Sequence, residues 1–346
     1  MTAVEDLWKL SQGYRVTQTI YVAAVLGISD HLADGPRDVG WIAEQCDCDP
    51  ASLYRLLRAL ATVGVYEELP GRQFGLTPLG EALRHGIPGS VAPWVEHMAS
   101  GSHRAAWGGL LGSIRTGENA FKAIHGESAW DYRAARPEAN AVFDAAMTSI
   151  SQIVSAGVLD AYDFGGLATI IDIGGGRGAL LGAILARYPE ARGVLGDQPH
   201  VIAGAPDVLD ALGVRDRCEV VSVDFFEAVP EGGDAYVLKS IIHDWEDPEA
   251  VAILRTVRRA MAAGSVVLLV ERLIGEPNGE PGGVAMLAAF SDLNMLVGPG
   301  GRERTEAEYD AIFAAAGLRR SRTVRTATGF AVIEAVADSE AGPPTP

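Results

Sequence analysis

The stretch ATIIDIGGGRGALLGAILARYP (residues 168–189) decides the fold of this chain. It begins with a short apolar run typical of a buried strand, turns at GGGRG (174–178), and continues as a helix that ends at Pro189. A glycine-rich turn lets the backbone approach a ligand closely, with the first N–H groups of the helix directed at it. The stretch therefore predicts the first strand–turn–helix unit of an α/β domain that binds a ligand at the turn.

The chain beyond this stretch repeats the alternation of strand-like and helical patterns. Strands are predicted at 193–197, 219–224, 235–239 and 265–271, and helices at 199–213 and 247–264. Strands that alternate with helices form a parallel sheet with right-handed crossovers. We therefore expect a parallel sheet that starts at residue 168.

Polar and ionisable residues follow the predicted strands one after another. They are Asp172, Asp197, Asp224, Lys239, His243 and Glu271. Because the carboxyl ends of parallel strands share one edge of the sheet, ligands bind in the crevice at that edge. We therefore expect these residues to lie around one site.

The residue types at this edge suit an adenosine. The carboxylate of Asp197 can accept two hydrogen bonds from the diol of a ribose. Asp224 can accept a hydrogen bond from the amine of adenine, and Phe225 can stack on the base. GGGRGA also satisfies the dinucleotide pattern G-x-G-x-x-A, but the turn makes no special provision for a second nucleotide.

Each of these side chains also has a purely structural interpretation. The alternatives are a helix cap for Asp197, a turn cap for Asp224, an ion pair with Arg272 for Glu271, and a solvated charge for Lys239. A lone histidine such as His243, in SIIHDWED (240–247), suits a structural corner as well as a catalytic base.

The N-terminal hundred residues have helical patterns followed by two short strands. The predicted elements are a helix at 16–36, a short helix before a turn at 47–50, a helix at 51–63, and strands at 65–69 and 73–77. Helix, turn, helix and a two-stranded wing predict a winged helix. Its candidate recognition helix has only Arg55 and Arg58 as basic residues, which favours packing or dimerisation over DNA binding.

Further helical patterns with scattered aromatic residues fill the segment between these two parts. The predicted organisation is a winged-helix dimerisation domain (1–100), a helical linker that contributes to a ligand pocket (101–165), a Rossmann-like domain (166–338) and a disordered tail (339–346).

The 346 residues carry a formal net charge of −17. A strongly acidic surface repels phosphate backbones and anionic lipids, so we expect neither nucleic acid nor a membrane as a partner. The N-terminus does not have the pattern of a secretory signal, and no apolar run approaches the roughly 20 residues of a membrane span. Cys46, Cys48 and Cys218 lack the spacing of zinc ligands, which favours reduced thiols, a cytoplasmic location and no metal.

The joint order of the motifs resembles that of the S-adenosylmethionine-dependent O-methyltransferases of the caffeate and hydroxyneurate type, whose bacterial relatives modify aromatic natural products. The resemblance covers nearly the whole chain and is carried by SIRTGENAFKAIHGESAWDY (113–132), IIDIGGGRGALL (170–181), VDFFEAVPEGGDAYVLKSIIHDWED (223–247), VVLLVERLI (266–274) and DLNMLVGPGGRERTEAEYDAIFAAAGL (292–318). It implies a Rossmann-like class I methyltransferase domain preceded by a mostly α-helical winged-helix dimerisation domain. It also implies a homodimer, with S-adenosylmethionine as cofactor and S-adenosylhomocysteine as product.

The resemblance further implies roles for individual residues. The implied cofactor-binding set is Asp172, Gly174, Gly176, Asp197, Asp224, Phe225, Lys239 and Ser240. The implied catalytic set is His243 as general base, Glu271 and Glu303 as the acids that flank and orient it, and the adjacent Asp244. Two positions depart from the usual pattern, Val223 for glycine and Gln198 for leucine, and neither removes a functional side chain.

The residue types suit methyl transfer to a phenol. A phenol has a pKa of about 10, so it is protonated at neutral pH, and a neutral imidazole can accept its proton during the attack. A carboxylate on the other ring nitrogen sets the tautomer and stabilises the imidazolium that forms.

We therefore predict methylation of a hydroxyl on an aromatic small molecule in secondary metabolism such as antibiotic biosynthesis. The residues expected near this acceptor, again from the resemblance, are Trp130, Phe143, Met147, Phe290, Asn294 and Met295. The alternatives are N- or C-methylation and a relative whose cofactor is only structural. A DNA-binding regulator or a nicotinamide-dependent oxidoreductase fits the charge and the single-adenosine pattern less well.

Overall fold

The computed structural model describes residues 2–275 and 283–338, and the chain divides into two compact units. The first unit comprises Met1–Ala105 with Asp131–Ile150, and the second comprises Ala106–Trp130 with Ser151–Pro346. Residues of the predicted helical linker (101–165) fall in both units. The predicted disordered tail (339–346) lies outside the described residues.

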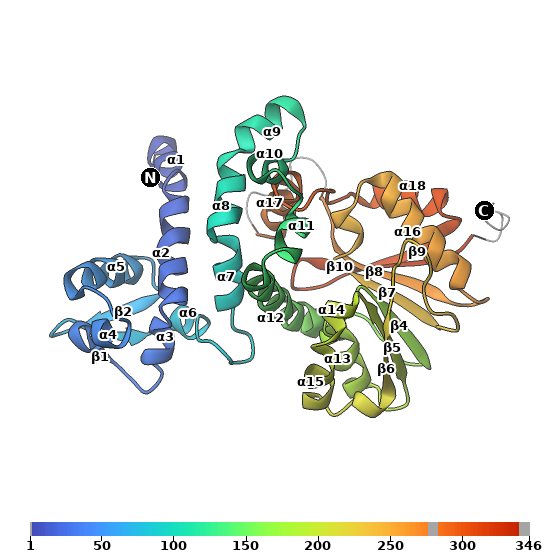
Figure 1. Ribbon diagram of the computed structural model, residues 1–346, viewed down its shortest axis with the longest axis horizontal. Coiled ribbons are helices and arrows are strands. Elements are labelled where there is room, and N and C mark those ends of the chain that lie inside the picture. The colour runs from blue at the N-terminus through green and yellow to red at the C-terminus, as the bar shows by residue number, and fades with distance from the viewer. Residues whose placement is uncertain (1, 276–282, 339–346) are drawn as a thin grey trace. The chain divides into compact units, whose positions relative to one another are not determined.

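The first unit contains the predicted winged helix (Figure 1). Its elements are α1 (Ala3–Leu10), α2 (Gly13–Val25), α3 (Ile28–His31), β1 (Arg37–Asp38), α4 (Val39–Gln45), α5 (Pro50–Thr62), β2 (Tyr66–Leu69), β3 (Gln73–Leu76), α6 (Pro78–Glu81) and α7 (Ala92–Met98). Strand β3 pairs antiparallel with both β2 and β1, which completes the wing. The single helix expected at 16–36 is two helices instead, because Gly27 adopts the left-handed conformation (φ 60°) between them.

Helix α5 shows how the local sequence builds this unit. Asp49 caps the N-terminus of the helix, and Pro50 occupies its first turn. Leu53, Leu57 and Leu60 recur at helical spacing and are buried in one apolar cluster with the strands of the wing. The helix therefore packs through its apolar face, as the sequence predicts.

Helix α1 presents apolar side chains to the solvent. Val4, Leu7, Trp8 and Leu10 are all highly exposed, with at least 69% of the surface of each residue accessible. A dense exposed apolar surface of this kind marks a place where proteins associate.

The described residues of the second unit form a seven-stranded sheet with the strand order β6-β5-β4-β7-β8-β10-β9. The strands are β4 (Thr169–Ile173), β5 (Arg192–Asp197), β6 (Cys218–Ser222), β7 (Ala235–Lys239), β8 (Val266–Arg272), β9 (Leu318–Arg325) and β10 (Phe330–Ala337). Strands β4 to β8 pair in parallel, as predicted. The strand order changes direction beside β4, which is where open sheets of this type bind ligands.

Strands β9 and β10, which extend the sheet in antiparallel fashion, were not anticipated from the sequence. Only residues 326–329 join these two strands, too few for a helical crossover, so β9 and β10 form an antiparallel hairpin. Strand β10 also pairs antiparallel with β8. Strand β9 is an edge strand with four arginines, and it lacks the apolar run by which the other strands are recognisable.

Helices lie on both sides of this sheet (Figure 1). The described helices that belong wholly to this unit are α9 (Leu110–Thr116), α10 (Ala120–His125), α13 (Ala179–Arg187), α14 (Pro199–Ile202), α15 (Ala205–Ala211), α16 (Asp247–Ala260), α17 (Gly283–Val297) and α18 (Glu306–Ala315); α8 (Gly101–Gly108), α11 (Ala129–Ala134) and α12 (Pro137–Ala161) contain residues of both units. The helix expected at 199–213 is divided into α14 and α15 by the pair Ala203-Gly204. The class of fold, a Rossmann-like domain preceded by a mostly helical winged-helix domain, is confirmed.

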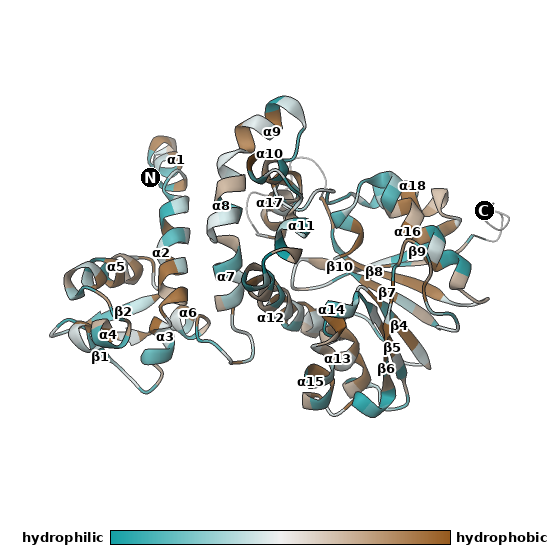
Figure 2. Cartoon of the chain, in the orientation of Figure 1, coloured by the Kyte–Doolittle hydropathy of each residue, from teal (hydrophilic) through white to brown (hydrophobic). Residues whose placement is uncertain are grey.

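The central strands form the core of the second unit. Leu238 of β7 and Leu269 of β8 are fully buried in one apolar cluster with Leu254 and Val257 of α16 and Phe313 of α18. Figure 2 shows the hydrophobic character along these strands. Near-continuous apolar runs are typical of strands that are covered on both faces, which is why the sequence identified them.

The expectation that no apolar run approaches the length of a membrane span is wrong for helix α12. This 25-residue helix is long and apolar enough to cross a membrane by length and composition, with a mean hydropathy of 1.4 over 18 residues. One third of that window is buried inside the protein, and a core helix passes the same test. The helix is therefore weak evidence for a membrane span.

The buried face of α5 predicts a stability effect. Leu57→Ala removes a fully buried side chain from the apolar cluster of the first unit, so we expect a loss of about 2–5 kcal/mol in the free energy of unfolding of this unit. Urea unfolding followed by circular dichroism measures it. Arg55→Ala, on the exposed face of the same helix, is the control and changes the free energy by less than about 0.5 kcal/mol. Equal effects of the two substitutions would contradict this packing.

Candidate active site

The structure brings the strand-end residues of the prediction to one edge of the sheet. Asp172 lies on β4, Asp197 ends β5, Lys239 ends β7 and Glu271 lies at the end of β8. Because these strands are parallel neighbours, their carboxyl ends form one continuous edge. Asp224 follows β6 by two residues and extends the same edge.

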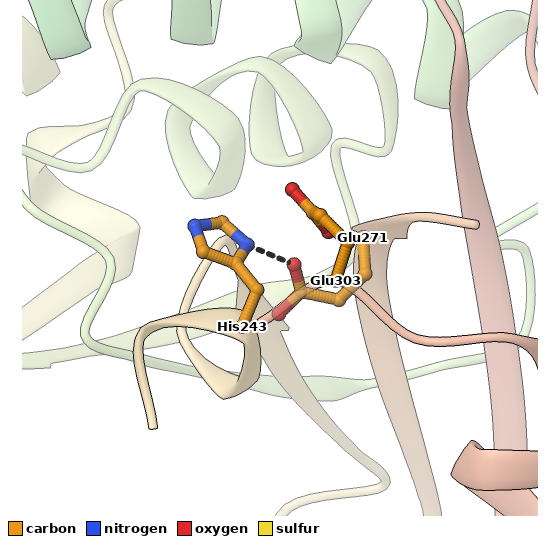
Figure 3. Close-up of side chains that lie close together, drawn as sticks. All are labelled: His243, Glu271 and Glu303. Carbon is orange, nitrogen blue, oxygen red and sulfur yellow. Dashed lines mark hydrogen bonds and ion pairs between the residues drawn. The ribbon is translucent and has the colours of Figure 1, made fainter. Parts of the chain in front are cut away.

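His243 is held by Glu271. The histidine lies on a single 3-10 turn (Ile242–Asp244) after β7, and its Nδ1 is 2.5 Å from Oε2 of Glu271 (Figure 3). The other carboxylate oxygen of Glu271 accepts hydrogen bonds from the N–H groups of Ile241 (3.1 Å) and Ile242 (2.8 Å). One fully buried carboxylate therefore holds both the imidazole ring and the turn that carries it.

Glu303 reaches the same cluster from the loop between α17 and α18. Its Oε1 accepts a hydrogen bond from the Ser291 hydroxyl (2.7 Å), while its buried Oε2 has no hydrogen-bond partner among the described residues. Atoms of Glu303, His243 and Glu271 lie within 4.8 Å of one another, a spacing that would also suit a divalent metal ion. The short contact between His243 and Glu271 requires a proton on Nδ1, which favours a hydrogen-bonded pair. The absence of a metal stays a prediction.

The acids around His243 control its protonation. Burial alone lowers the pKa of His243, but the negative charges of Glu271, Glu303 and Asp244 outweigh it and raise this pKa to about 10. Burial and the neighbouring Glu271 raise the pKa of Glu303, and His243 opposes that shift. The acids of the site therefore favour a proton on the imidazole.

The ring geometry leaves one nitrogen for a ligand. Nδ1 is occupied by Glu271, and the other nitrogen, Nε2, points away from that carboxylate (Figure 3). Asp244 places Oδ1 3.5 Å from Nε2, beyond ordinary hydrogen-bond length. Nε2 is thus the atom at which His243 can exchange a proton with a bound molecule.

The glycine-rich turn lies close to the histidine turn. Gly174 has a φ of 67°, and a Cβ added there would come within 2.4 Å of the Ile241 side chain. Only glycine therefore fits at this position. The N–H of Gly176 donates to Asp197 (2.8 Å), and the second oxygen of Asp197 accepts from the Gln198 N–H (2.6 Å).

Asp172 places a buried carboxyl beside the glycine-rich turn. The residue is buried, and neither carboxylate oxygen has a hydrogen-bond partner in the described part of the chain. Burial raises its pKa to about 7, although Lys239 opposes the shift. A buried carboxyl without donors is costly unless a ligand supplies them, so the residues present fit a cationic cofactor with an amino group and hydroxyls.

The other predicted cofactor residues differ in their surroundings. Asp224 accepts a hydrogen bond from the Phe226 N–H (2.9 Å), which is the turn-capping role that the sequence left open. The ring of Phe225 lies 6.1 Å from that of Trp245, centre to centre, and its Cε1 would lie 3.8 Å from a Cβ added at Gly174. Ser240 has a φ of 57°, an uncommon conformation for a non-glycine residue, directly after Lys239.

The residues expected near the acceptor belong to different units. Trp130, Phe290, Asn294 and Met295 lie in the second unit, and Phe143 and Met147 lie in the first. The Asn294 side-chain oxygen accepts a hydrogen bond from the indole N–H of Trp107 (3.1 Å). Phe143 has the Arg133 guanidinium 4.0 Å from its ring centre.

Sequence reasoning missed several charged and polar groups that complete the site. Ser291 holds Glu303, and Arg304 is fully buried beside the histidine turn. Arg272, which the sequence offered as an ion-pair partner of Glu271, has a pKa that burial lowers, while the nearby Glu303 and Glu271 oppose that shift. These residues stand next to predicted ones in the sequence, but nothing in the pattern distinguishes a buried arginine from an exposed one.

The raised pKa of His243 predicts a pH dependence of stability. Because the folded pKa of about 10 exceeds the ordinary value of about 6.5, the proton stabilises the folded state below about pH 6.5, and this contribution is lost as the pH rises through about 10. The gap in melting temperature between the wild type and His243→Gln should therefore shrink from neutral to alkaline pH. Thermal unfolding in matched buffers measures this gap. A difference in melting temperature that does not change with pH would contradict a raised pKa of His243 in the folded protein.

Family comparisons agree with this architecture. A model described as an O-methyltransferase domain matches residues 107–319, and a model described as an O-methyltransferase dimerisation domain matches residues 8–85. The first match alone covers more than half of the chain.

Individual relatives cover almost the whole chain. The phenazine O-methyltransferase PhzM of Lysobacter antibioticus is 43% identical over 95% of both chains. The 8-amino-8-demethylriboflavin N,N-dimethyltransferase of Streptomyces davaonensis is 39% identical over 92% of this chain and 90% of its own.

A solved structure bears on the cofactor. The O-methyltransferase NcsB1 from neocarzinostatin biosynthesis, in complex with S-adenosylmethionine and 2-hydroxy-5-methyl naphthoic acid, is 32% identical, with a TM-score of 0.77 over 93% of this chain and 96% of that chain. The site described above has a buried carboxyl and a glycine-rich turn, which fit such a cofactor. The chain therefore belongs to the O-methyltransferase family and is an S-adenosylmethionine-dependent O-methyltransferase with an N-terminal dimerisation domain.

Proposed function

We propose that this enzyme methylates a hydroxyl of an aromatic small molecule of secondary metabolism, with His243 as general base. The observation that carries the proposal is the pairing of His243 Nδ1 with the buried Glu271, which leaves Nε2 for the acceptor. Phenazine, riboflavin and naphthoic acid in the names of the relatives are all fused aromatic ring systems. The aromatic and apolar side chains predicted near the acceptor suit such a ring.

The chemistry divides between the cofactor and the chain. S-adenosylmethionine supplies an electrophilic methyl group, so the chain has to position the acceptor and accept its proton. Glu271 holds the imidazole ring in place and stabilises the positive charge that forms on it. Nε2 accepts the proton of the acceptor hydroxyl as the new bond forms.

The protonation of His243 has to change before it acts as a base. In the cofactor-free protein its pKa of about 10 keeps the imidazole protonated at neutral pH. A cationic ligand beside the ring disfavours the imidazolium, because like charges repel, and lowers this pKa toward neutrality. Glu303 and Asp244 then offset part of that repulsion, which is the role we propose for them.

The proposed cofactor contacts follow the geometry of the sheet edge. Asp197 accepts hydrogen bonds from the ribose hydroxyls, and Asp172 and the turn at Gly174 and Gly176 take the methionine part. The adenine lies between Asp224 and Phe225, while Lys239 and Ser240 complete the wall next to the histidine turn. The oxygens of Asp172, which have no hydrogen-bond partner within the described ranges, and the glycine conformations support this assignment.

We also infer a homodimer formed through the N-terminal domain and a location in the cytoplasm. The match to a dimerisation domain and the exposed apolar residues of α1 support the dimer. The three cysteines form no disulfide in the described part of the chain, as in a reducing compartment. The absence of nucleic acid and membrane partners stays a prediction.

A second candidate is N-methylation on the same scaffold. The relative from Streptomyces davaonensis is named as an N,N-dimethyltransferase, so this type of fold also serves nitrogen acceptors. Mass spectrometry and NMR of the product distinguish the two, because they locate the new methyl group on oxygen or on nitrogen. A product without a methyl gain would exclude both.

The role of His243 predicts the effect of its replacement. For His243→Gln we expect turnover to fall by roughly 10²- to 10⁴-fold, the usual contribution of a general base. In the wild type the turnover should rise with pH as the imidazole loses its proton. The measurement is steady-state turnover with a hydroxylated phenazine or naphthoic acid that the wild type methylates. Calorimetry with S-adenosylhomocysteine should show that the variant still binds the cofactor. Unchanged turnover with intact cofactor binding would remove His243 as the base.

The role of Asp197 predicts a separate effect on the cofactor. Asp197→Ala removes two carboxylate acceptors for the ribose, so the affinity for S-adenosylhomocysteine should fall by about 10- to 100-fold. Isothermal titration calorimetry measures it. Asp207→Ala, an exposed aspartate on α15, is the matched control and should bind like the wild type. Equal affinities of both variants would show that Asp197 only orders the turn through Gly176.

A further inference from the structure

Arg304 is the largest fully buried side chain among the described residues. It directly follows Glu303 in the segment GGRERT (300–305). A buried guanidinium is costly unless its donors are paired. What Arg304 binds therefore shows what it is for.

Most of the donors of Arg304 are directed at the turn that carries His243. Its Nη1 donates to the Ile242 carbonyl (3.0 Å), and its Nη2 donates to the Trp245 carbonyl (2.8 Å). These carbonyls lie just before and two residues after His243. Nε (3.0 Å) and Nη2 (2.8 Å) also bind one carboxylate oxygen of Asp247, at the start of α16. The guanidinium therefore holds the turn on both sides of the histidine.

The backbone of the same segment also packs against this turn. Gly301 has a φ of 71°, and a Cβ added there would lie 2.2 Å from the His243 carbonyl oxygen. The Arg304 backbone carbonyl accepts a hydrogen bond from the Ile274 N–H (3.0 Å), just beyond the end of β8. The segment is thus attached both to the strand that carries Glu271 and to the turn that carries His243.

We propose that Arg304 is a positioning residue that sets the distance and orientation of His243 relative to Glu271 and Glu303. Glu303 and Arg304 are neighbours in the chain, so the contact that holds the histidine turn also places the second acid. The inference depends on the proposed role of His243 as general base. Lysine cannot replace this function, because its ammonium lacks the planar fork of donors that reaches two carbonyls and a carboxylate together.

The size of the expected effect follows from the geometry of proton transfer. A displacement of about 1 Å at a reacting group can lower a rate by roughly 100-fold. Arg304→Lys should therefore lower kcat by about 10- to 100-fold, with the KM for the acceptor and the affinity for S-adenosylhomocysteine within about 2-fold of the wild type. Because the ring moves away from Glu271, the pKa of His243 should also fall.

The experiment combines turnover with a direct titration of His243. The titration follows the ring C–H signal by NMR in protein labelled at histidine, with the signal assigned by its loss in His243→Gln. It needs no acceptor. Arg302→Lys is the matched control: Arg302 lies in the same segment and pairs with Asp247, but it does not contact the turn carbonyls. For Arg302→Lys we expect a kcat within about 2-fold of the wild-type value. The acid dissociation constant of His243 in this control should also lie within about 2-fold of that of the wild type.

The outcomes separate this proposal from the proposed function. A lower His243 pKa together with a lower kcat supports both. A lower pKa with unchanged kcat supports the positioning role but overturns the general-base role of His243. An unchanged titration in folded Arg304→Lys overturns the positioning role, whatever the turnover. If Arg304→Lys does not fold, Asp247→Asn is the second variant, because it removes the carboxylate that anchors the guanidinium. It should lower the pKa of His243 in the same way. A wild-type titration of His243 in Asp247→Asn overturns the proposal.

Discussion

The hydrogen bond between His243 and Glu271 is the interaction on which the rest of the site depends. Glu271 is fully buried, and it avoids the cost of an unpaired carboxylate by accepting from the imidazole and from two backbone N–H groups of the histidine turn. These contacts form because β7 and β8 pair in parallel with Lys239 beside Val270, so Glu271 lies next to the residues that follow β7. The register of two neighbouring strands therefore fixes the distance between the proposed base and its partner.

The buried charges require further partners. In the second unit these partners come from elements that follow strand β8 in the sequence. Glu303 enters from the loop before α18 and is held by Ser291 of α17. Arg304 joins that loop to the histidine turn and to the start of α16. The same negative charges that orient His243 also raise its pKa to about 10. In the proposed mechanism, a cationic cofactor at this edge lowers the pKa of His243 and so favours the neutral imidazole that acts as the base.

Much of this could be predicted from the sequence, since the evidence was local. The strands β4 to β8 are short apolar runs, and in a parallel sheet their ends must share an edge, which is why Asp172, Asp197 and Glu271 were expected together. The antiparallel hairpin of β9 and β10 was not expected, because β9 is an arginine-rich edge strand without an apolar run. The length of helix α12 was not expected, because polar residues interrupt its apolar pattern in the sequence. The structure nevertheless forms one continuous helix of 25 residues there, long enough for a membrane span.

The sequence by itself determined the alternation of strands and helices from β4 to β8, the glycine-rich turn, the winged helix and the identity of the ionisable residues at the strand ends. These follow from periodicity, turn residues and parallel connections, all of which act over short stretches of chain. Only the tertiary structure decided that Glu271 and Arg304 approach His243 from segments 28 and 61 residues farther along, and that Gly301 must lack a side chain. It also decided that the described part of the chain offers no hydrogen-bond donor to the oxygens of Asp172. The physical reason is that burial and pairing depend on which distant segments meet, and no local pattern encodes that meeting.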